Sequence, residues 1–215
     1  MGTRLGNSVN LYEKYILPPI LNCACGLALL KSHRKDIVPR AMGSVLEIGV
    51  GSSLNKAFYN FDQITEIVGL DPNESLLKIA QDNSSILSDK ISLAGGTSEH
   101  LPFPSNHFDS VVITFTLCTI PQPEKAVKEI RRVLKSRGHI HFCEHGQSPN
   151  PGIEKLQRFI EPIWKPLAGG CHLSRDIFTL ITDGGFELFD HETIYADGVP
   201  KFVGHLYKGS AKKIN

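Results

Sequence analysis

Short apolar, β-branched runs alternate with segments of helical periodicity through the middle of this chain of 215 residues. The apolar runs lie at residues 44–49, 66–71, 91–96, 110–115 and 139–144, and helices are expected around 54–60, 73–82 and 123–135. Such alternation predicts βαβ units and a parallel sheet covered on both faces. Two late strand-like stretches, 186–197 and 201–209, predict a closing antiparallel hairpin. We therefore expect an α/β fold with a seven-stranded, mostly parallel sheet and helices on both faces.

The later part of the chain has weaker signals. Residues 153–167 have the pattern of an amphipathic helix that Pro162 interrupts. Ser174 stands where an N-cap would begin a further helix, which glycines then end. With 41% hydrophobic and 21% charged residues, the composition is that of a globular protein with one sizeable core. We expect residues 1–215 to form a single domain.

The formal net charge of +1 gives no basic field for a nucleic-acid backbone, so a nucleic-acid partner is not expected. The five cysteines are an odd number in a chain too large to need stapling. This usage favours a reducing compartment over a disulfide framework, and we interpret the protein as cytoplasmic.

An apolar run from Ile16 to Leu30 resembles a signal-peptide core or a membrane span. At 15 residues it is too short to span, and it contains Pro18, Pro19 and Asn22. We interpret it as a packed N-terminal helix that starts after the prolines. The alternative is that this segment touches a membrane surface without inserting stably.

A glycine pair follows the first expected strand. Gly49 and Gly51 fall at the first βα turn, where the backbone of an open α/β sheet comes closest to a ligand and a Cβ would obstruct it. Twenty residues on, Asp71 ends the second strand, where a carboxylate can accept hydrogen bonds from both hydroxyls of a ribose. The expected ligand therefore carries a ribose.

The pattern around these glycines disfavours a dinucleotide. That fingerprint requires a third glycine, G-x-G-x-x-G, and this chain lacks it, with Ser53 in that part of the turn. Glu47 stands two residues before the first glycine, and a carboxylate there would repel a pyrophosphate but attract an ammonium or sulfonium group. S-adenosylmethionine has both of these groups and a ribose.

Four stretches carry a family resemblance: VLEIGVGSS, VGLDPNESLLKIA, GGTSEHLPFPSNHFDSVVITFTL and AVKEIRRVLKSRGHIHFCEHG. Together they resemble the Rossmann-like class I methyltransferases, in particular the ubiquinone and menaquinone C-methyltransferases, from about Val45 to Gly146. The pattern G-x-x-x-N-x-x-F-Y, then LCTI, EH and FIEPIWKPLAGGCHLSRD, resembles more closely the methyltransferase-like alkyl thiol S-methyltransferases and extends the match to about Asp176. The first 40 residues match poorly.

The resemblance implies S-adenosylmethionine as the cofactor and S-adenosylhomocysteine as the product. It assigns residues to the methionine end (Glu47, Gly49, Gly51, Phe115, Thr116 and Cys118), the ribose (Asp71) and the adenine (Pro72, Thr97, Ser98 and Glu99). Thr97 stands where the family usually has an Asp that reads the adenine amino group, so recognition there must rest on a hydroxyl or on backbone.

Methyl transfer from a sulfonium is an in-line displacement, and a base is needed only when the acceptor must lose a proton. Position after the fifth strand nominates His145 and Glu144, although His145 could equally be a hydrogen-bonded turn residue and Glu144 an anchor of the strand end. The sequence TLCT in place of an NPPY-like tetrad argues against an amide or exocyclic amine acceptor. Cys171 and His172 have no partner pair at zinc spacing, so no metal is expected.

The acceptor pocket is expected between an N-terminal lid (residues 1–40) and an insertion over the site (150–175). The aromatic and imidazole side chains expected there are Tyr12, Tyr15, Phe159, Trp164 and His172. They suit a small apolar acceptor, a thiol or a quinone or phenol ring, although plain packing of the insertion would also explain them. Two alternatives are a cofactor-binding module without catalysis and an NAD(P)-dependent reductase, against which the absence of a Tyr-x-x-x-Lys pair counts.

Overall fold

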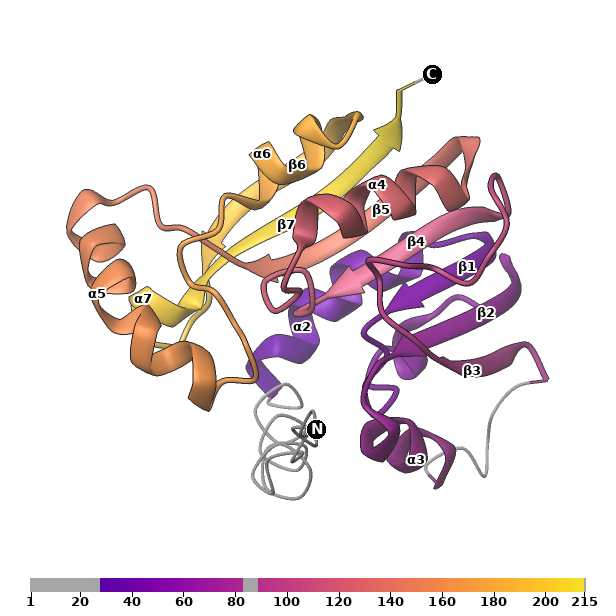
Figure 1. The fold of residues 1–215 in the computed structure, drawn as a ribbon, viewed down its shortest axis with the longest axis horizontal. Helices are drawn as coiled ribbons and strands as arrows, with labels where there is room; N and C mark the ends of the chain where they lie inside the picture. The colour runs from indigo at the N-terminus through magenta and orange to yellow at the C-terminus, as the bar shows by residue number, and fades with distance from the viewer. Residues whose placement is uncertain (1–27, 83–88, 215) are drawn as a thin grey trace, which may run out of the picture.

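The computed structural model describes residues 28–82 and 89–214. Within them the chain forms one sheet with helices on both sides (Figure 1). The strands are β1 (Gly43–Ile48), β2 (Ile64–Asp71), β3 (Ile91–Gly95), β4 (Phe108–Thr114), β5 (Leu134–His145), β6 (Phe186–Tyr195) and β7 (His205–Lys213). The helices are α2 (Ala28–Ile37), α3 (Glu74–Asp82), α4 (Pro123–Val133), α5 (Pro151–Leu167), α6 (Ile177–Asp183) and α7 (Lys201–Gly204), with 3₁₀ turns η2 (Val38–Arg40) and η3 (Lys56–Phe58).

The strand order among the described residues is β3-β2-β1-β4-β5-β7-β6. The first five strands pair in parallel, whereas β7 runs antiparallel to both β5 and β6. The central strands β1 and β4 are buried along almost their whole length, as expected for parallel strands covered on both faces. The predicted seven-stranded, mostly parallel sheet with a C-terminal antiparallel hairpin is confirmed.

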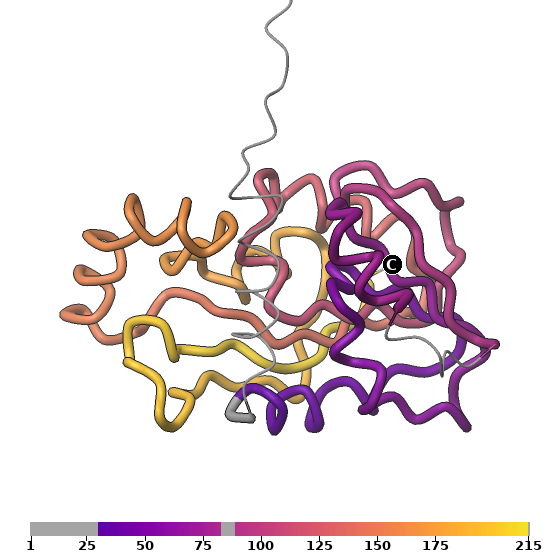
Figure 2. Tube along the Cα trace, turned by 90° about the horizontal axis from the view of Figure 1, so that it is seen from below, coloured from indigo at the N-terminus to yellow at the C-terminus, as the bar shows by residue number. Residues whose placement is uncertain are grey.

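Alternate residues of β1 face two separate cores. Leu46 and Ile48 belong to the large core beneath α4 and α6, whereas Val45 belongs to a second core on the opposite face. On that second side, α2 packs against β5 and β7. In Figure 2 the indigo α2 runs along the lower edge and the orange α5 stands at the upper left. Helix α2 therefore covers the face of the sheet opposite the large core, and α5 lies to one side of the sheet.

The helix predicted around 54–60 is wrong. The chain there makes turns and then the single 3₁₀ turn η3, because the backbone is left-handed at Gly51 and Ser53 and already extended at Tyr59. Too few residues remain between these points for a regular α-helix.

Two other local predictions need correction. Pro162 does not interrupt the predicted amphipathic helix, because α5 continues through Pro162 and Pro166 to Leu167. The N-cap of α6 is Asp176 and not Ser174, since the Asp176 carboxylate accepts a hydrogen bond from the Thr179 N–H.

The N-terminal region is described only from Ala28. The predicted helix after Pro19 therefore lies mostly outside the described residues, and Tyr12 and Tyr15 lie outside them entirely. In the described ranges, no helix combines the length and the apolar character that crossing a bilayer requires.

Candidate active site

A cavity of 620 Å³ lies at the carboxyl ends of β1, β2 and β4. Its volume is in the range of small-molecule sites in proteins, which is about 300 to 1,000 Å³. Of the residues predicted to bind the cofactor, those that line this cavity are Gly49, Gly51, Asp71, Pro72, Thr97, Ser98, Glu99, Phe115 and Thr116. Glu47 and Cys118 are absent from its lining. The parallel topology thus gathers most of the predicted set at one edge of the sheet.

The glycine turn after β1 takes a conformation that other residues rarely adopt. Gly49 and Gly51 have φ angles of +70° and +53°. A Cβ at Gly49 would collide with the side chain of Thr116, which comes from the neighbouring strand end. Glycine is therefore required at Gly49 by both backbone conformation and close packing.

Asp71 connects the glycine turn to the end of β2. Its Oδ2 accepts a hydrogen bond from the Gly51 N–H over 2.9 Å, and its Oδ1 accepts one from the Asn73 N–H over 2.8 Å. Burial raises the pKa of this carboxyl group, and the two backbone hydrogen bonds oppose that rise. Each oxygen keeps a second lone pair, so the carboxylate can still accept hydrogen bonds from a ligand in the cavity.

Glu47 lies behind the cavity wall. Its carboxylate accepts hydrogen bonds from Asn55 Nδ2 over 2.9 Å and from the Tyr59 hydroxyl over 2.8 Å. Burial raises the pKa of Glu47 to about 7, against the lowering effects of the Tyr59 hydrogen bond and the charge of Arg34. The carboxylate therefore belongs to a buried network, and direct attraction of a ligand by Glu47 finds no support in this arrangement.

Arg34 of α2 supplies a cation to the cavity wall, and the sequence analysis missed it. Its Nη1 donates hydrogen bonds of 2.6 Å to Asn55 Oδ1 and to Thr114 Oγ1. The guanidinium carbon lies 5.0 Å from the ring centroid of Phe115, and the buried Nε has no hydrogen-bond partner. Asn55 is the N of the pattern G-x-x-x-N-x-x-F-Y, which was the one signal in the sequence pointing to this network.

The predicted adenine side of the cavity has apolar and hydroxyl groups. Leu76, Ile120 and Pro121 line the cavity, as do the residues Pro72 and Thr97 predicted for the adenine. In addition, the Glu99 carboxylate accepts hydrogen bonds from Ser98 Oγ and from the Gln122 N–H, both over 3.4 Å. Thr97 stands in place of the usual Asp, and Glu99 and Asp71 are the carboxylates that line the cavity.

Glu144 holds the loop after β4. Its two carboxylate oxygens accept hydrogen bonds from the N–H groups of Thr116 over 2.9 Å and Cys118 over 3.1 Å. The side chain is fully buried, which raises the pKa of its carboxyl group. It is absent from the cavity lining, so the structure supports the anchoring interpretation over the catalytic one.

His145 does not line the cavity but packs against a residue that does. Its ring is 5.2 Å from that of the cavity-lining Phe115, and its Nδ1 is 2.8 Å from the carbonyl oxygen of Val203. A carbonyl only accepts, so Nδ1 carries the proton in this hydrogen bond and Nε2 has a free lone pair. Burial lowers the pKa of His145 to about 4, so the imidazole is neutral at physiological pH.

Within residues 28–82 and 89–214, the side chains predicted for the acceptor do not line the cavity. Trp164 packs edge-on against Phe202, and His172 Nδ1 pairs with Glu161 Oε1 at 2.8 Å. Phe159 is 81% exposed and cannot be packed over the site. The insertion reaches the cavity at Gly169, just after α5.

Two cysteines that the sequence analysis considered lie close together near the insertion. Cys118 and Cys171 are buried with their sulfur atoms 3.7 Å apart and form a small cluster with Leu173. Residues 28–82 and 89–214 contain no group of three or more His, Cys, Asp or Glu side chains placed to hold a metal ion.

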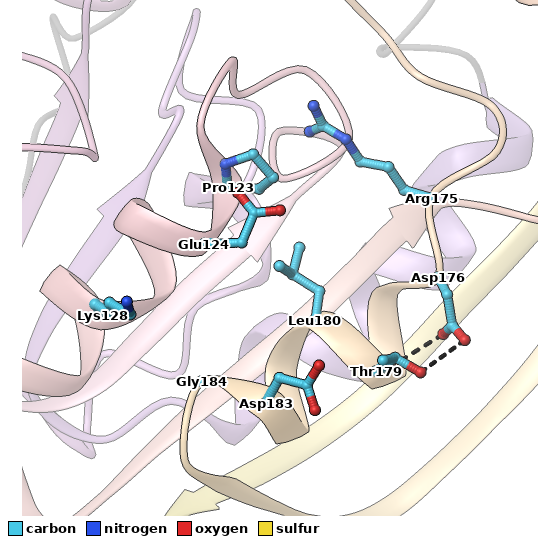
Figure 3. Close-up of a pocket in the computed structure, with 9 residues that line it drawn as sticks. All are labelled: Pro123, Glu124, Lys128, Arg175, Asp176, Thr179, Leu180, Asp183 and Gly184. Atoms are coloured by element: carbon cyan, nitrogen blue, oxygen red, sulfur yellow. Dashed lines mark hydrogen bonds between the residues drawn. The ribbon is translucent and has the colours of Figure 1, made fainter.

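A second hollow of 460 Å³ lies between α4 and α6 (Figure 3). Its lining mixes the charges of Glu124, Lys128, Arg175 and Asp183. None of the predicted site residues lines it. This hollow is therefore separate from the cavity at the glycine turn.

The fold and part of the sequence are similar to those of known proteins. Residues 46–142 match a family model described as a methyltransferase domain. A solved S-adenosylmethionine-dependent methyltransferase from Thermotoga maritima shares the fold, with a TM-score of 0.63, 21% identity, and coverage of 91% of this chain and 92% of that one. The described chain therefore has the fold of this solved methyltransferase, and residues 46–142 are similar to a methyltransferase domain.

Two kinds of curated methyltransferase are similar to this chain in sequence. The chain is 32% identical over 148 residues to thiol S-methyltransferase TMT1B of Rattus norvegicus, which is 66% of this chain and 59% of the relative. It is 33% identical over 129 residues to the ubiquinone/menaquinone biosynthesis C-methyltransferase UbiE of Ectopseudomonas mendocina, 58% of this chain and 50% of that relative. The chain thus spans little more than half the length of these relatives.

Proposed function

We propose that this protein transfers a methyl group from S-adenosylmethionine to a small apolar acceptor, with a thiol favoured and a quinone or phenol ring next. One observation carries the proposal: the cavity has the Asp71 carboxylate beside the glycine turn and, separately, the Arg34 guanidinium beside Phe115. An acceptor for ribose hydroxyls and a cation for a carboxylate match the two polar parts of the cofactor. The names of the relatives support a thiol or a quinone.

The described residues fit the cofactor in parts. Asp71 would hold the ribose through its remaining lone pairs, and Arg34 would pair with the carboxylate of the methionyl part. The buried Arg34 Nε without a partner is consistent with this role, because a buried donor left unpaired is costly. Pro72 and Ile120 would cover the adenine with apolar surface.

When bound, the cofactor supplies an electrophilic methyl group on a sulfonium. The chain's task is then to position the acceptor in line with that group and to exclude water. Phe115 and Thr116 are the side chains that close the cavity at the end of β4. Their loop is held in place by Glu144, which makes Glu144 a positioning residue in this proposal.

Proton removal from a thiol does not fit His145 well. A thiol has an ordinary pKa of about 8.5, and the pKa of His145 is lowered to about 4. Transfer between them is uphill by about 4.5 pKa units, or roughly 6 kcal/mol. The acceptor would therefore bind as the thiolate, after its proton is released to solvent. His145 then packs behind Phe115 and does not act as a base.

The proposal also includes the cellular compartment and the size class of the acceptor. The described cysteines Cys118, Cys143 and Cys171 are free thiols, which supports a reducing, cytoplasmic setting. A net charge of +1 supports a small molecule over a nucleic acid as the acceptor.

The test is calorimetry with two ligands on the parent and on Arg34→Met. S-adenosylhomocysteine carries the methionyl carboxylate, whereas 5′-methylthioadenosine keeps the nucleoside and lacks that part. We expect Arg34→Met to weaken S-adenosylhomocysteine binding by about tenfold or more and to leave methylthioadenosine binding within about twofold. Equal losses for both ligands would contradict the assignment of Arg34.

Turnover is tested separately with thiol, phenol and quinone panels and detection of methylated product. Binding of S-adenosylhomocysteine without product from any panel would favour a cofactor-binding module that lacks catalysis. Binding of NADPH in place of S-adenosylhomocysteine would favour a reductase.

A further inference from the structure

Helix α5 exposes a continuous apolar stripe to solvent. Phe159 is 81% exposed, Ile163 68%, Leu167 58% and Leu156 43%. The spacings of three and four residues place these side chains on one face of the helix. They are four of the seven large apolar side chains that are exposed in the described part of the chain.

The opposite face of α5 is already attached to the protein. Gln157 is 1% exposed, donates hydrogen bonds from Nε2 to the carbonyl oxygens of Gly146 and Phe202, and accepts one from the Ser148 N–H. Trp164 also packs against Phe202 from this side. The helix is therefore held firmly, and the apolar stripe is not the face that fixes it to the fold.

Basic side chains border the stripe. Lys155 precedes Phe159 by one helical turn. Arg158, three residues after Lys155, and Lys165, seven residues after Arg158, continue the same flank. Lys155 and Lys165 form no ion pair with any acid in the described ranges.

The two acids of α5 leave Lys155 and Lys165 without a partner, although one of them offsets Arg158. Glu154 pairs with Arg158 at 2.9 Å. Glu161 turns towards the body, where it pairs with His172 and accepts a hydrogen bond from the Ser174 N–H. The exposed arc of the helix is thus apolar on one side and positively charged on the other.

We propose that α5 is a docking surface for an anionic lipid bilayer. A helix with an apolar stripe and a basic flank lies in the interfacial plane of a membrane, with its apolar side chains inserted and its cations at the headgroups. A second copy of this chain would fit less well, because the surface offers it no free acids on α5 to meet Lys155 and Lys165. The inference does not depend on the proposed function.

The position of α5 gives the docking a consequence. The helix stands beyond the carboxyl end of β5, on the same side as the ends of β1 and β4 (Figure 1). Two residues after Leu167, Gly169 lines the cavity. A bilayer on α5 would therefore lie near the segment through which the insertion meets the cavity, where an apolar acceptor dissolved in lipid could reach it.

The experiment measures co-sedimentation of the full chain with two kinds of vesicle, pure phosphatidylcholine and a two-to-one mixture of phosphatidylcholine and phosphatidylglycerol. We expect the parent to bind the mixed vesicles and to lose binding as salt rises. Phe159→Ser with Ile163→Ser should weaken this binding by about tenfold or more. The control, Met42→Ser with Ile214→Ser, removes two apolar side chains elsewhere that are 52% and 48% exposed, and it should bind as the parent does.

A charge pair of variants separates lipid electrostatics from apolar contact. Lys155→Glu with Lys165→Glu should weaken binding to the anionic vesicles by about tenfold or more, and Lys125→Glu with Lys128→Glu on α4 is its control. Retained binding of S-adenosylhomocysteine, or an unchanged melting temperature, shows that each variant is folded.

Three results would overturn the inference. The first is a parent that does not bind anionic vesicles, and the second is equal binding by the parent and both α5 variants, which would assign membrane contact to another segment. The third is a dimer of the parent in analytical ultracentrifugation that Phe159→Ser with Ile163→Ser converts to a monomer without any effect on vesicles, which would make α5 a contact between copies.

Discussion

Replacement of Glu47 by Gln should make the free energy of unfolding less sensitive to pH. Glu47 is 3% exposed, and burial raises its pKa from 4.5 to about 7. Glutamine keeps the size and one acceptor oxygen for Asn55 or Tyr59, but it carries no charge at any pH. The substitution therefore isolates the cost of ionising this buried carboxyl group.

The sign follows from proton binding. Between pH 4.5 and about 7 the folded protein holds a proton on Glu47 that the unfolded chain has released. The stabilisation from this group is complete below pH 4.5 and is lost as the pH rises through about 7. At about 1.4 kcal/mol per pKa unit, the shift corresponds to roughly 3 kcal/mol.

Urea unfolding of the parent and Glu47→Gln at pH 5 and pH 8 measures this quantity. Relative to the parent, the variant should gain about 2.5 kcal/mol in unfolding free energy from the lower to the higher pH. Other titrating groups, such as His145, are common to both proteins and cancel. Glu187→Gln, at an exposed carboxylate on β6, is the matched control. A difference between parent and Glu47→Gln that stays constant with pH would refute the reasoning.

Three further predictions concern the cavity. Gly49→Ala should lower the unfolding free energy by about 2 kcal/mol or more, measured by thermal or urea unfolding, because the φ of +70° and the contact with Thr116 both exclude a Cβ; stability equal to the parent would contradict it. Asp71→Asn should weaken S-adenosylhomocysteine binding by about tenfold to a hundredfold in calorimetry, since a charged acceptor is lost; unchanged affinity would remove Asp71 from the ribose site. His145→Gln should leave kcat/KM with an alkyl thiol within about tenfold of the parent, with the rate still rising towards the thiol's own pKa; loss of that rise would restore His145 as the base.

The sheet was predictable because its signal is local and strong. The apolar runs that form β1 and β4 are buried on both sides. Continuous apolar runs that alternate with helical segments are typical of parallel strands joined by helical crossovers. The turn around 54–60 was not predictable in this way, since its conformation follows from left-handed residues and from buried hydrogen bonds to Glu47.

Sequence position fixes the edge of the sheet at which a residue lies, but not the direction of its side chain. Gly49, Asp71 and Phe115 were placed correctly at the carboxyl edge and line the cavity. Glu144 and His145 end β5 at the same edge, yet Glu144 turns under the β4 loop and His145 packs behind Phe115. Consecutive side chains of a strand point to opposite faces of the sheet. At the end of a strand, the loop that covers each face then decides what the side chain contacts.

The charge of the cavity wall depends on Arg34, which lies outside every motif, although its partner Asn55 belongs to one. Arg34 reaches Asn55 and Thr114, which are 21 and 80 residues away in the chain, only because α2 packs behind the strand ends. Glu47, expected to attract a sulfonium, is instead drawn into that same network by Asn55. The cavity wall therefore presents a cation where the sequence suggested an anion. Under the proposed function, this cation would bind the carboxylate of the cofactor. Discrimination against a pyrophosphate would then come from the turn that lacks the third glycine.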